Sequence, residues 1–291
     1  MIVSTKIGYL GPKGTFTKTA VDALFNTDEK VSYLTIPECI DAVKYGHVTY
    51  GVLPLENALE GTVNVTLDYL IQYKSLKIVS EIVVPIKQHL MVHPDHQEDW
   101  KSITTIYSHP HALAQCHRFL HNGMKHVNAE TYTSTGAAAK FVSENPDLKI
   151  GAIANELAAK EYGLKIVQAN IHDFENNHTR FVVLHKNDKE WHSENLTLKG
   201  YKTTLMISLP TDHPGALHQV LSAFAWRKIN LSKIESRPMK TGLGNYYFLV
   251  DVEKKMDDIL IPNTIAEMEA LGCSAEVLGS YPYFLYDDTL K

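Results

Sequence analysis

Short apolar runs alternate with amphipathic stretches through the first 184 residues. Runs such as 6–10, 51–54 and 150–154 have the length of buried strands, and stretches such as 63–73 have helical spacing. Strands that alternate with helices predict a parallel or mixed sheet with helices on its faces. The predicted strands are 6–10, 31–36, 51–54, 78–85, 88–92, 103–107 and 150–154. The predicted helices are 16–25, 37–45, 63–73, 108–120, 134–142 and 155–162.

The pattern contains two cycles of this kind, which predict two α/β lobes over residues 5–184 with a cleft between them. Open α/β sheets bind ligands at the carboxyl ends of their strands, and those ends carry most of the polar motifs here. The charged, weakly patterned stretch 185–202 is typical of a linker.

The pattern changes from residue 203, where a second domain is predicted over 203–282. Its predicted elements are strand 203–209, helix 214–227, strand 229–237, turn 240–244, strand 245–252, helix 257–271 and strand 275–281. This βαββαβ order is the ferredoxin-like arrangement, so the fold class is two α/β lobes followed by an α+β domain.

Composition narrows the class of protein. The chain has 291 residues, 44% of them hydrophobic, which is enough for two packed domains. The net charge of −5 gives no electrostatic reason to expect nucleic acid. The three cysteines are far apart, so a reducing compartment is the simplest interpretation. There is no apolar signal-peptide core and no run long enough to span a membrane, so we expect a cytoplasmic protein with no membrane partner.

Five clusters of small and hydrogen-bonding residues occupy the strand–helix junctions. Each could bring polar side chains or helix amide groups to an anionic ligand. The clusters are Gly11-Pro12-Lys13-Gly14-Thr15-Phe16, residues 54–63, residues 108–116, residues 134–139, and Asn177-His178-Thr179-Arg180-Phe181. The first, taken alone, could equally be an ordinary tight turn.

These five clusters, in this order, resemble the prephenate dehydratase family. The resemblance rests on Gly-Pro-x-Gly-Thr-Phe, Pro-Leu-Glu-Asn, Ser-His-Pro, Ser-Thr-Gly-Ala-Ala and Thr-Arg-Phe, and it covers about residues 5–184. Ala58 stands where many members have serine, and His111 where many have glutamine. The resemblance implies a catalytic domain like the type II periplasmic binding proteins.

The resemblance also implies the reaction, a carbon–oxygen lyase step in phenylalanine biosynthesis. Prephenate loses its ring carboxyl as CO2 and its ring hydroxyl as water, which gives phenylpyruvate. Because aromatisation supplies much of the driving force, no cofactor or metal is expected. The resemblance places the substrate-binding residues at Thr15, Asn57, Thr62, Ser134, Thr135, Gly136, Asn177 and Phe181.

Three residues are candidates for catalysis. Thr179 is the residue that the family pattern marks as essential, and we interpret it as a donor to the leaving hydroxyl. Arg180 can clamp a substrate carboxylate in bidentate fashion. Glu56 is a second candidate proton donor if burial raises its pKa. Alternatively, Glu56 is a structural carboxylate.

The second domain resembles an ACT domain, through Pro214-Gly215-Ala216-Leu217 and Glu235-Ser236-Arg237-Pro238. The resemblance implies that L-phenylalanine binds as effector between two such domains, so a homodimer or homotetramer is expected. Asn230 and Leu231 should lie near this site. Alternatively, Pro-Gly is only a helix start and Arg237 a surface charge.

Several residues could carry other chemistry. His89, His93 and His96 are close in sequence, and His117 and His121 share a helix face, but neither group has an acidic or cysteine partner at metal-ligand spacing. We therefore interpret them as solvated or hydrogen-bonded side chains. Cys116 lies on an apolar helix face, which is typical of a core residue rather than a nucleophile.

Two other functions fit the same sequence. Arogenate dehydratase performs the same elimination on the aminated substrate. A small-molecule sensor is the alternative from a different class, because solute-binding proteins share the two-lobed fold.

Overall fold

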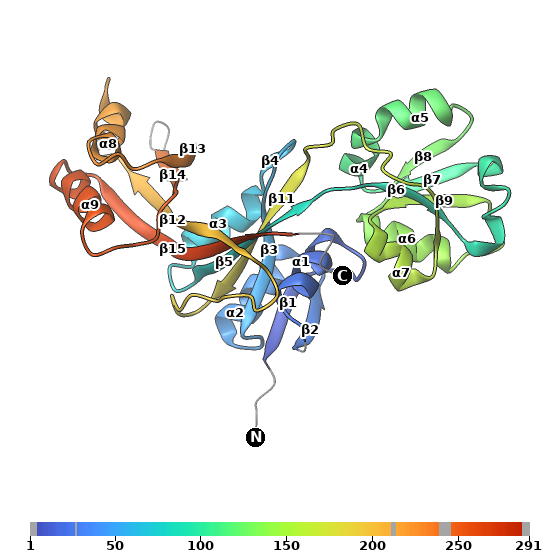
Figure 1. The fold of residues 1–291 in the computed structure, drawn as a ribbon, viewed down its shortest axis with the longest axis horizontal. Coiled ribbons are helices and arrows are strands. Elements are labelled where there is room, and N and C mark those ends of the chain that lie inside the picture. The colour runs from blue at the N-terminus through green and yellow to red at the C-terminus, as the bar shows by residue number, and fades with distance from the viewer. Residues whose placement is uncertain (1–4, 27, 211–213, 239–245, 287–291) are drawn as a thin grey trace.

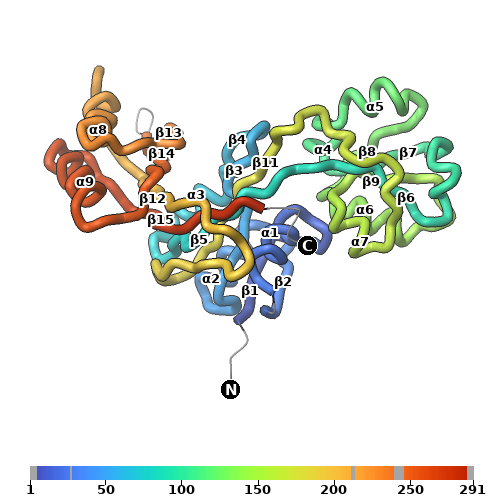
Figure 2. The backbone as a smooth tube through the Cα atoms, in the orientation of Figure 1, coloured from blue at the N-terminus to red at the C-terminus, as the bar shows by residue number. Residues whose placement is uncertain are grey.

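The computed structural model describes residues 5–26, 28–210, 214–238 and 246–286. They form three parts along the long axis of the molecule: lobe 1 (5–85 and 178–185), lobe 2 (86–177) and a C-terminal domain (198–285). Lobe 1 is in the middle, and lobe 2 and the C-terminal domain lie on opposite sides of it (Figure 1). The chain crosses between the lobes twice (Figure 2). The crossings are tied by hydrogen bonds from Ile86 N–H to the Asn177 carbonyl and from Ile171 N–H to the Gln88 carbonyl.

Lobe 1 is a mixed sheet with helices on both faces. Its elements are β1 (Lys6–Leu10), α1 (Phe16–Leu24), β2 (Glu29–Tyr33), α2 (Ile36–Tyr45), β3 (Tyr50–Asn57), β4 (Gly61–Thr62), α3 (Asn64–Gln72), β5 (Lys77–Pro85) and β11 (His178–His185). The strand order is β5-β11-β3-β1-β2, with β11 antiparallel to both neighbours. One core packs α1 against the sheet, and a second packs α2 and α3 against the other face.

Lobe 2 is a smaller α/β unit. Its elements are β6 (His89–Val92), the 3-10 turns Pro94–His96 and Trp100–Ser102, β7 (Thr105–Ser108), α4 (Pro110–Gln115), α5 (His117–Gly123), β8 (Asn128–Thr131), α6 (Thr135–Ser143), β9 (Ile150–Ala154), α7 (Glu156–Tyr162) and β10 (Lys165–Gln168). The sheet order is β10-β6-β9-β7-β8. Cys116 is fully buried, and this burial raises the pKa of its thiol to about 12, which fits the predicted core role.

The C-terminal domain confirms the predicted βαββαβ order. It contains β12 (Leu198–Ser208), α8 (Ala216–Ala225), β13 (Leu231–Pro238), β14 (Tyr246–Val252), α9 (Leu260–Ala270) and β15 (Ser274–Leu285). Its sheet order is β13-β14-β12-β15, and the end of β15 pairs in parallel with β5 of lobe 1. The sheets of lobe 1 and the C-terminal domain are therefore continuous.

A few elements differ from the sequence prediction. The helix predicted over 108–120 breaks at Cys116 into α4 and α5, and its N-cap is His109 rather than Ser108. β12 begins at Leu198, inside the predicted linker, because Leu198 finds a partner in Phe284 of β15. β8 was not predicted because all four of its side chains are exposed, so it has no apolar pattern.

Two further strands, β4 and β10, are also absent from the prediction, because neither has the apolar pattern of a strand in its own sequence. The turn predicted over 240–244 lies outside the described residues. None of the described helices combines the length and the apolar character that a membrane span requires.

Candidate active site

A hydrogen-bonded group of three polar residues lies where β3 ends and β11 begins. Thr179 and Asn57 are cross-strand partners, and their side chains lie on the same face of the sheet. Asn57 Nδ2 is 2.9 Å from Thr179 Oγ1 and 3.0 Å from Asn177 Oδ1. Asn177 is 1% exposed and Thr179 is 8% exposed, so the group is almost shielded from water. The structure therefore brings together three of the predicted site residues.

The turn after β3 fixes which way the Asn57 amide points. Its Oδ1 accepts hydrogen bonds from the backbone N–H groups of Leu59 and Glu60, at 3.0 and 3.1 Å. Its Nδ2 must then face Thr179 and donate to the threonine oxygen. Because Thr179 Oγ1 accepts this bond, its own O–H remains available as a donor. The arrangement suits a hydroxyl that donates to a reacting group.

A second group of predicted residues lies where lobe 1 meets α6 of lobe 2. Ser134 caps α6 by accepting a hydrogen bond from Ala137 N–H, and Thr15 caps α1 in the same way through Lys18 N–H. A Cβ on Gly136 would lie 2.6 Å from the Lys13 carbonyl oxygen, so only glycine lets the two backbones approach so closely. Thr135 is the first residue of α6 and is buried. Two helix N-termini, which favour anions, therefore lie side by side between the lobes.

A further contact joins the lobes next to Asn57. His111 Nε2 of α4 is 3.7 Å from a carboxylate oxygen of Glu60, in the turn between β3 and β4. The His109 ring packs edge-on against that of His111, and its Nδ1 accepts a hydrogen bond from His111 N–H. Burial and the neighbouring His111 lower the pKa of His109. His111, which departs from the commonest family pattern, thus bridges the two lobes.

Two of the predicted substrate-binding residues do not lie with these groups. Phe181 is 2% exposed and packs in the lobe 1 core with α1, so its ring is structural. The Thr62 hydroxyl donates to a carboxylate oxygen of Glu235 and accepts from Lys233 Nζ at 2.7 Å, both in the C-terminal domain. The β4 hairpin therefore turns the Thr62 side chain toward that domain, and its substrate-binding role stays a prediction.

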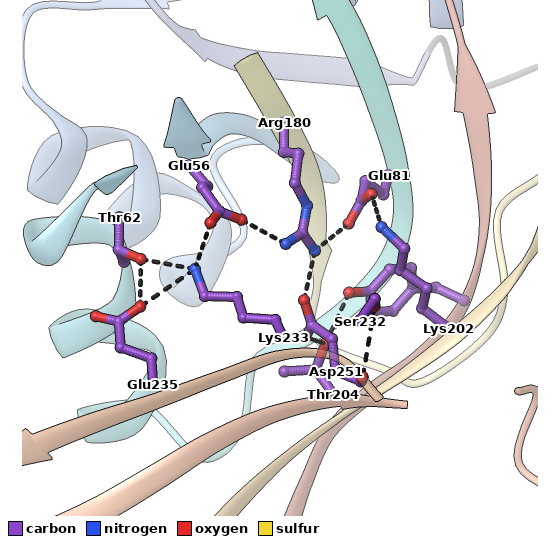
Figure 3. Close-up of polar contacts among 11 residues, drawn as sticks. Glu56, Thr62, Glu81, Arg180, Lys202, Thr204, Ser232, Lys233, Glu235 and Asp251 are labelled. Carbon is purple, nitrogen blue, oxygen red and sulfur yellow. Dashed lines mark hydrogen bonds and ion pairs between the residues drawn. The ribbon is translucent and has the colours of Figure 1, made fainter. Parts of the chain in front are cut away.

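The guanidinium of Arg180 also lies away from Thr179. Successive residues of a strand point to opposite faces, and Arg180 shares its face with Glu56. Its Nη atoms lie 2.6 Å from Glu56, 2.7 Å from Glu81 and 2.7 Å from Asp251 (Figure 3). Burial alone would lower the pKa of Arg180, but these carboxylates raise it above its ordinary value. Three protein carboxylates thus hold this guanidinium, and the substrate clamp stays a prediction that these ion pairs do not favour.

Of the two roles predicted for Glu56, its electrostatics favour the structural carboxylate over the proton donor. Its carboxylate contacts Lys233 Nζ at 3.0 Å as well as Arg180. Burial raises the pKa of Glu56, but the hydrogen bonds and charges of Lys233 and Arg180 outweigh it and lower the pKa below 4.5. Glu56 is therefore ionised at neutral pH and fits the structural alternative.

Replacing Glu56 with glutamine distinguishes the two roles. We expect the pH–rate profile near neutrality to keep its shape, because a carboxylate that is already ionised has no proton to donate there. The stability that Glu56 contributes is present above its unfolded pKa of 4.5 and is lost as the pH falls through its lower folded value. Urea unfolding of both proteins should therefore show a free-energy difference that shrinks on acidification. Loss of an alkaline limb from the rate profile near neutral pH, where the rate of the parent falls as a donor loses its proton, would restore Glu56 as a donor.

The predicted effector residues lie in two segments of the C-terminal domain. Gly215 has a φ of 88° and precedes α8, and Ala216 and Leu217 form its first turn. Glu235, Ser236, Arg237 and Pro238 end β13, whose first residue is Leu231. The Arg237 guanidinium contacts Asn64 and, at 2.7 Å, Asp68 of α3 in lobe 1. The Asn230 amide donates to Glu253.

A cavity of about 720 Å³ lies beside the interlobe contacts, along α1, the β5 end and the start of α7. None of the predicted substrate residues lines it. Across the ranges given above, no group of three or more histidine, cysteine, aspartate or glutamate side chains is placed to hold a metal ion. His117 and His121 stack on each other with ring centroids 5.5 Å apart.

Several important residues had not been predicted. Glu81, Lys202 and Asp251 are all buried, and they surround Arg180 together with Lys233. Glu81 and Asp251 could have been found, because a carboxylate inside an apolar strand needs a buried partner.

Comparisons with known proteins agree with these features. A family model described as prephenate dehydratase matches residues 7–189, and one described as ACT domain matches residues 203–265. A prephenate dehydratase of Bacillus subtilis is 56% identical over 279 residues, which are 95% of this chain and 98% of the relative. The solved prephenate dehydratase of Arthrobacter aurescens, in complex with L-Phe, is 31% identical with a TM-score of 0.82, and the match covers 95% of this chain and 89% of that one. That of Staphylococcus aureus is 31% identical with a TM-score of 0.79, over 95% and 100% of the two chains.

Proposed function

Since this chain belongs to the prephenate dehydratase family, we propose that it converts prephenate to phenylpyruvate, CO2 and water as a carbon–oxygen lyase. The observation that carries the proposal is the Asn57–Thr179 hydrogen bond, which leaves the threonine O–H available at the meeting point of the lobes. The electron pair of the breaking C–CO2 bond moves into the ring, and the C–O bond to the hydroxyl breaks. One proton is taken up as the hydroxyl leaves as water.

Thr179 would assist the second of these bond changes. A hydroxyl is a poor leaving group, so a donor that strengthens its hydrogen bond as negative charge develops lowers the barrier. Thr179 is too weak an acid to be the source of the proton by itself. We therefore propose that it orients and stabilises the leaving hydroxyl, held in position by Asn57 and Asn177.

The substrate carboxylates need anion-binding groups, and the N-termini of α1 and α6 supply candidates. Thr15 and Ser134 cap these helices, and Gly136 keeps them close. Helix N-termini attract anions because their N–H groups are unsatisfied and the helix dipole is positive there. We propose this pair of helix ends, rather than Arg180, as the carboxylate site.

An assay with the purified protein tests the reaction. The protein is incubated with prephenate, and phenylpyruvate is measured by its absorbance at alkaline pH. Product from prephenate supports the proposal. Product from arogenate alone would make the protein an arogenate dehydratase, and no product from either would favour a sensor.

We further propose that L-phenylalanine inhibits this protein through the ACT domain, acting at Gly215–Leu217 and at the Glu235–Pro238 segment. The proposal is supported by the L-Phe complex of the Arthrobacter relative and by the open space at Gly215, where no atom of the described residues, its neighbours in the chain apart, lies within 4 Å of the position that a Cβ would take. Such a site between two ACT domains implies a homodimer or homotetramer, which light scattering would resolve. The three free cysteines agree with the cytoplasm as its location.

The effector site yields a specific prediction. We expect phenylalanine to raise the melting temperature of the parent protein, because a ligand that binds only the folded state stabilises it. Arg237→Ala should reduce this shift and raise the phenylalanine concentration for half inhibition by about tenfold, as the loss of about 1.4 kcal/mol of binding would. Arg227→Gln is the matched control, because Arg227 pairs with Glu267 inside the same domain. Equal inhibition of Arg237→Ala and the parent would show that the site is misplaced.

A further inference from the structure

Thr179 and Arg180 are adjacent residues of β11, and their side chains point to opposite faces of the sheet. Thr179 joins Asn57 on one face, and Arg180 joins Glu56 on the other. Because they share a peptide bond, a shift of the Arg180 backbone moves Thr179 as well. The residues that hold Arg180 in place therefore also help to position Thr179, the proposed donor.

Arg180 is held from both sides of the junction between lobe 1 and the ACT domain. We call the ion pairs around it the junction network, made up of Glu56, Glu81 and Arg180 from lobe 1 and Lys202, Lys233 and Asp251 from the ACT domain (Figure 3). Lys202 Nζ reaches Glu81 at 2.5 Å, and Lys233 Nζ reaches Glu56 at 3.0 Å. Arg180 is in direct contact with the ACT domain through Asp251 at 2.7 Å. The carboxylates of Glu81 and Asp251 are fully buried.

The network depends on all of its members. Its formal charges are three negative and three positive, so the loss of one cation leaves carboxylates facing each other in a buried site. Asp251 is fixed in turn by the Thr204 hydroxyl, which donates to its Oδ1 at 2.7 Å. Arg180 Nε, by contrast, is buried without a hydrogen-bond partner among the residues described. The position of the guanidinium thus depends on ion pairs, one of them with a domain that lies away from the cleft.

The segment expected to bind the effector adjoins this network. Lys233 lies 3.2 Å from Glu235 of the same strand, and Glu235 also accepts from Thr62 of lobe 1. Two residues further on, Arg237 holds Asp68 of α3. These three side chains all point from β13 toward lobe 1, since residues two apart share a strand face. An amino-acid carboxylate that engages Arg237 must compete with Asp68, and the competition would act on the same strand that carries Lys233.

The shape of the molecule limits the possible routes between effector and substrate. The ACT domain and lobe 2 lie on opposite sides of lobe 1 (Figures 1 and 2). Lobe 1 is therefore a route along which a change in the ACT domain can reach the cleft within one chain. In the junction network, β14 contacts the strand that carries Thr179 through Asp251 and Arg180, and β13 contacts β3 through Lys233 and Glu56.

We propose that Arg180 is a positioning residue, and that the junction network couples the ACT domain to Thr179, so that phenylalanine binding acts on the reaction by moving Arg180. This inference rests on the proposed dehydratase function and its inhibition by phenylalanine. It assigns Asp251 and Lys233 to the transmission of the signal, although neither is among the residues proposed to bind the substrate or the effector.

The first test separates a positioning role from a clamp. Arg180→Gln is assayed for kcat and KM with prephenate. A positioning role predicts a fall in kcat of about tenfold or more with KM within about twofold, because an interaction that acts only on the transition state is lost. A rise in KM with kcat unchanged would overturn the proposal, because that is the signature of lost substrate binding. Arg180→Lys should recover part of kcat, because it restores the charge but cannot bridge three carboxylates.

The second test removes the ACT end of the network. Asp251→Asn should raise the phenylalanine concentration for half inhibition by about fivefold or more, within the usual range of allosteric coupling. Glu267→Gln is the matched control, because it breaks an ion pair of 2.6 Å inside the ACT domain and should keep the parent's inhibition. Inhibition of Asp251→Asn at the parent's concentration would overturn the proposal. If circular dichroism shows that Asp251→Asn is unfolded, Lys233→Gln replaces it with the same two outcomes.

The parent protein is assayed first, with and without phenylalanine. Absence of turnover or of inhibition would contradict the proposed function itself, and the coupling with it. If the parent shows normal turnover and inhibition, the results for the variants test the role of the junction network alone.

Discussion

Thr179→Val is expected to lower kcat with prephenate by about 100- to 1000-fold, the usual effect of removing one transition-state donor. Valine has the shape of threonine and suits a strand, so the change removes the hydroxyl and little else. Asn57 keeps Asn177 Oδ1 as an acceptor at 3.0 Å, so the neighbouring amide is not left without a partner. KM should change little, because the hydrogen bond is needed most as the hydroxyl leaves. Steady-state rates across a range of prephenate concentrations measure both constants.

Thr179→Ser is the matched control for this change. Serine keeps the hydroxyl within reach of Asn57, so we expect kcat within about tenfold of the parent, a loss that its extra rotamer freedom accounts for. The melting temperatures of both variants should stay close to the parent's. A valine variant that retains kcat within a few-fold would remove Thr179 from the reaction and leave Asn57 as the better candidate.

The sequence was sufficient to predict the fold because local pattern and tertiary structure agree in most elements. β1 and β9 have the predicted bounds, since a strand that is buried in the middle of a sheet is a short apolar run in any context. β8 and β10 are edge strands of lobe 2, and their mostly polar sequences form strands only because β7 and β6 offer a partner. Such strands depend on tertiary contacts that a local pattern does not contain.

The sequence predicts which residues lie near one another in the candidate site better than it predicts where their side chains point. Motif order placed Asn57, Asn177 and Thr179 in one site, and hydrogen bonds do join them. The motif says nothing about which face of β11 each side chain occupies. Strand alternation could have shown that Thr179 and Arg180 point apart, and that a clamp and a donor on adjacent strand residues are hard to combine.

The roles of Glu56 and Thr62 could not be deduced from the sequence of the catalytic domain alone. The partners of Thr62, which are Lys233 and Glu235, lie 171 and 173 positions away in the second domain, and Lys233 also pairs with Glu56. The sequence pattern predicts two separate domains with a linker between them. β15 instead continues the lobe 1 sheet, which brings charged residues of both domains into one buried network.

That continuous sheet predicts a second large effect, at Gly279 of β15. A Cβ at this position would lie 2.2 Å from the Ile78 carbonyl oxygen of β5, a backbone atom that cannot rotate away. Gly279→Ala must therefore separate β15 from β5 where the ACT domain joins lobe 1. Overpacking of this kind typically costs about 1–3 kcal/mol, and a backbone clash belongs at or above the upper end. Urea unfolding should show this loss in free energy, with the ACT domain unfolding at a lower concentration than the lobes.

Gly123→Ala is the control for Gly279→Ala, because in the described part of the chain no atom outside its own helix turn and chain neighbours lies within 4 Å of its Cβ position at the end of α5. Alanine there should change the stability by less than about 1 kcal/mol, and toward higher stability, since it favours the helix more than glycine does. Gly279 precedes Tyr283, where the pairing of β15 with β5 begins, so the clash should also weaken inhibition by phenylalanine. A Gly279→Ala protein that unfolds with the parent's midpoint in one transition would show that the two domains are not joined through this sheet.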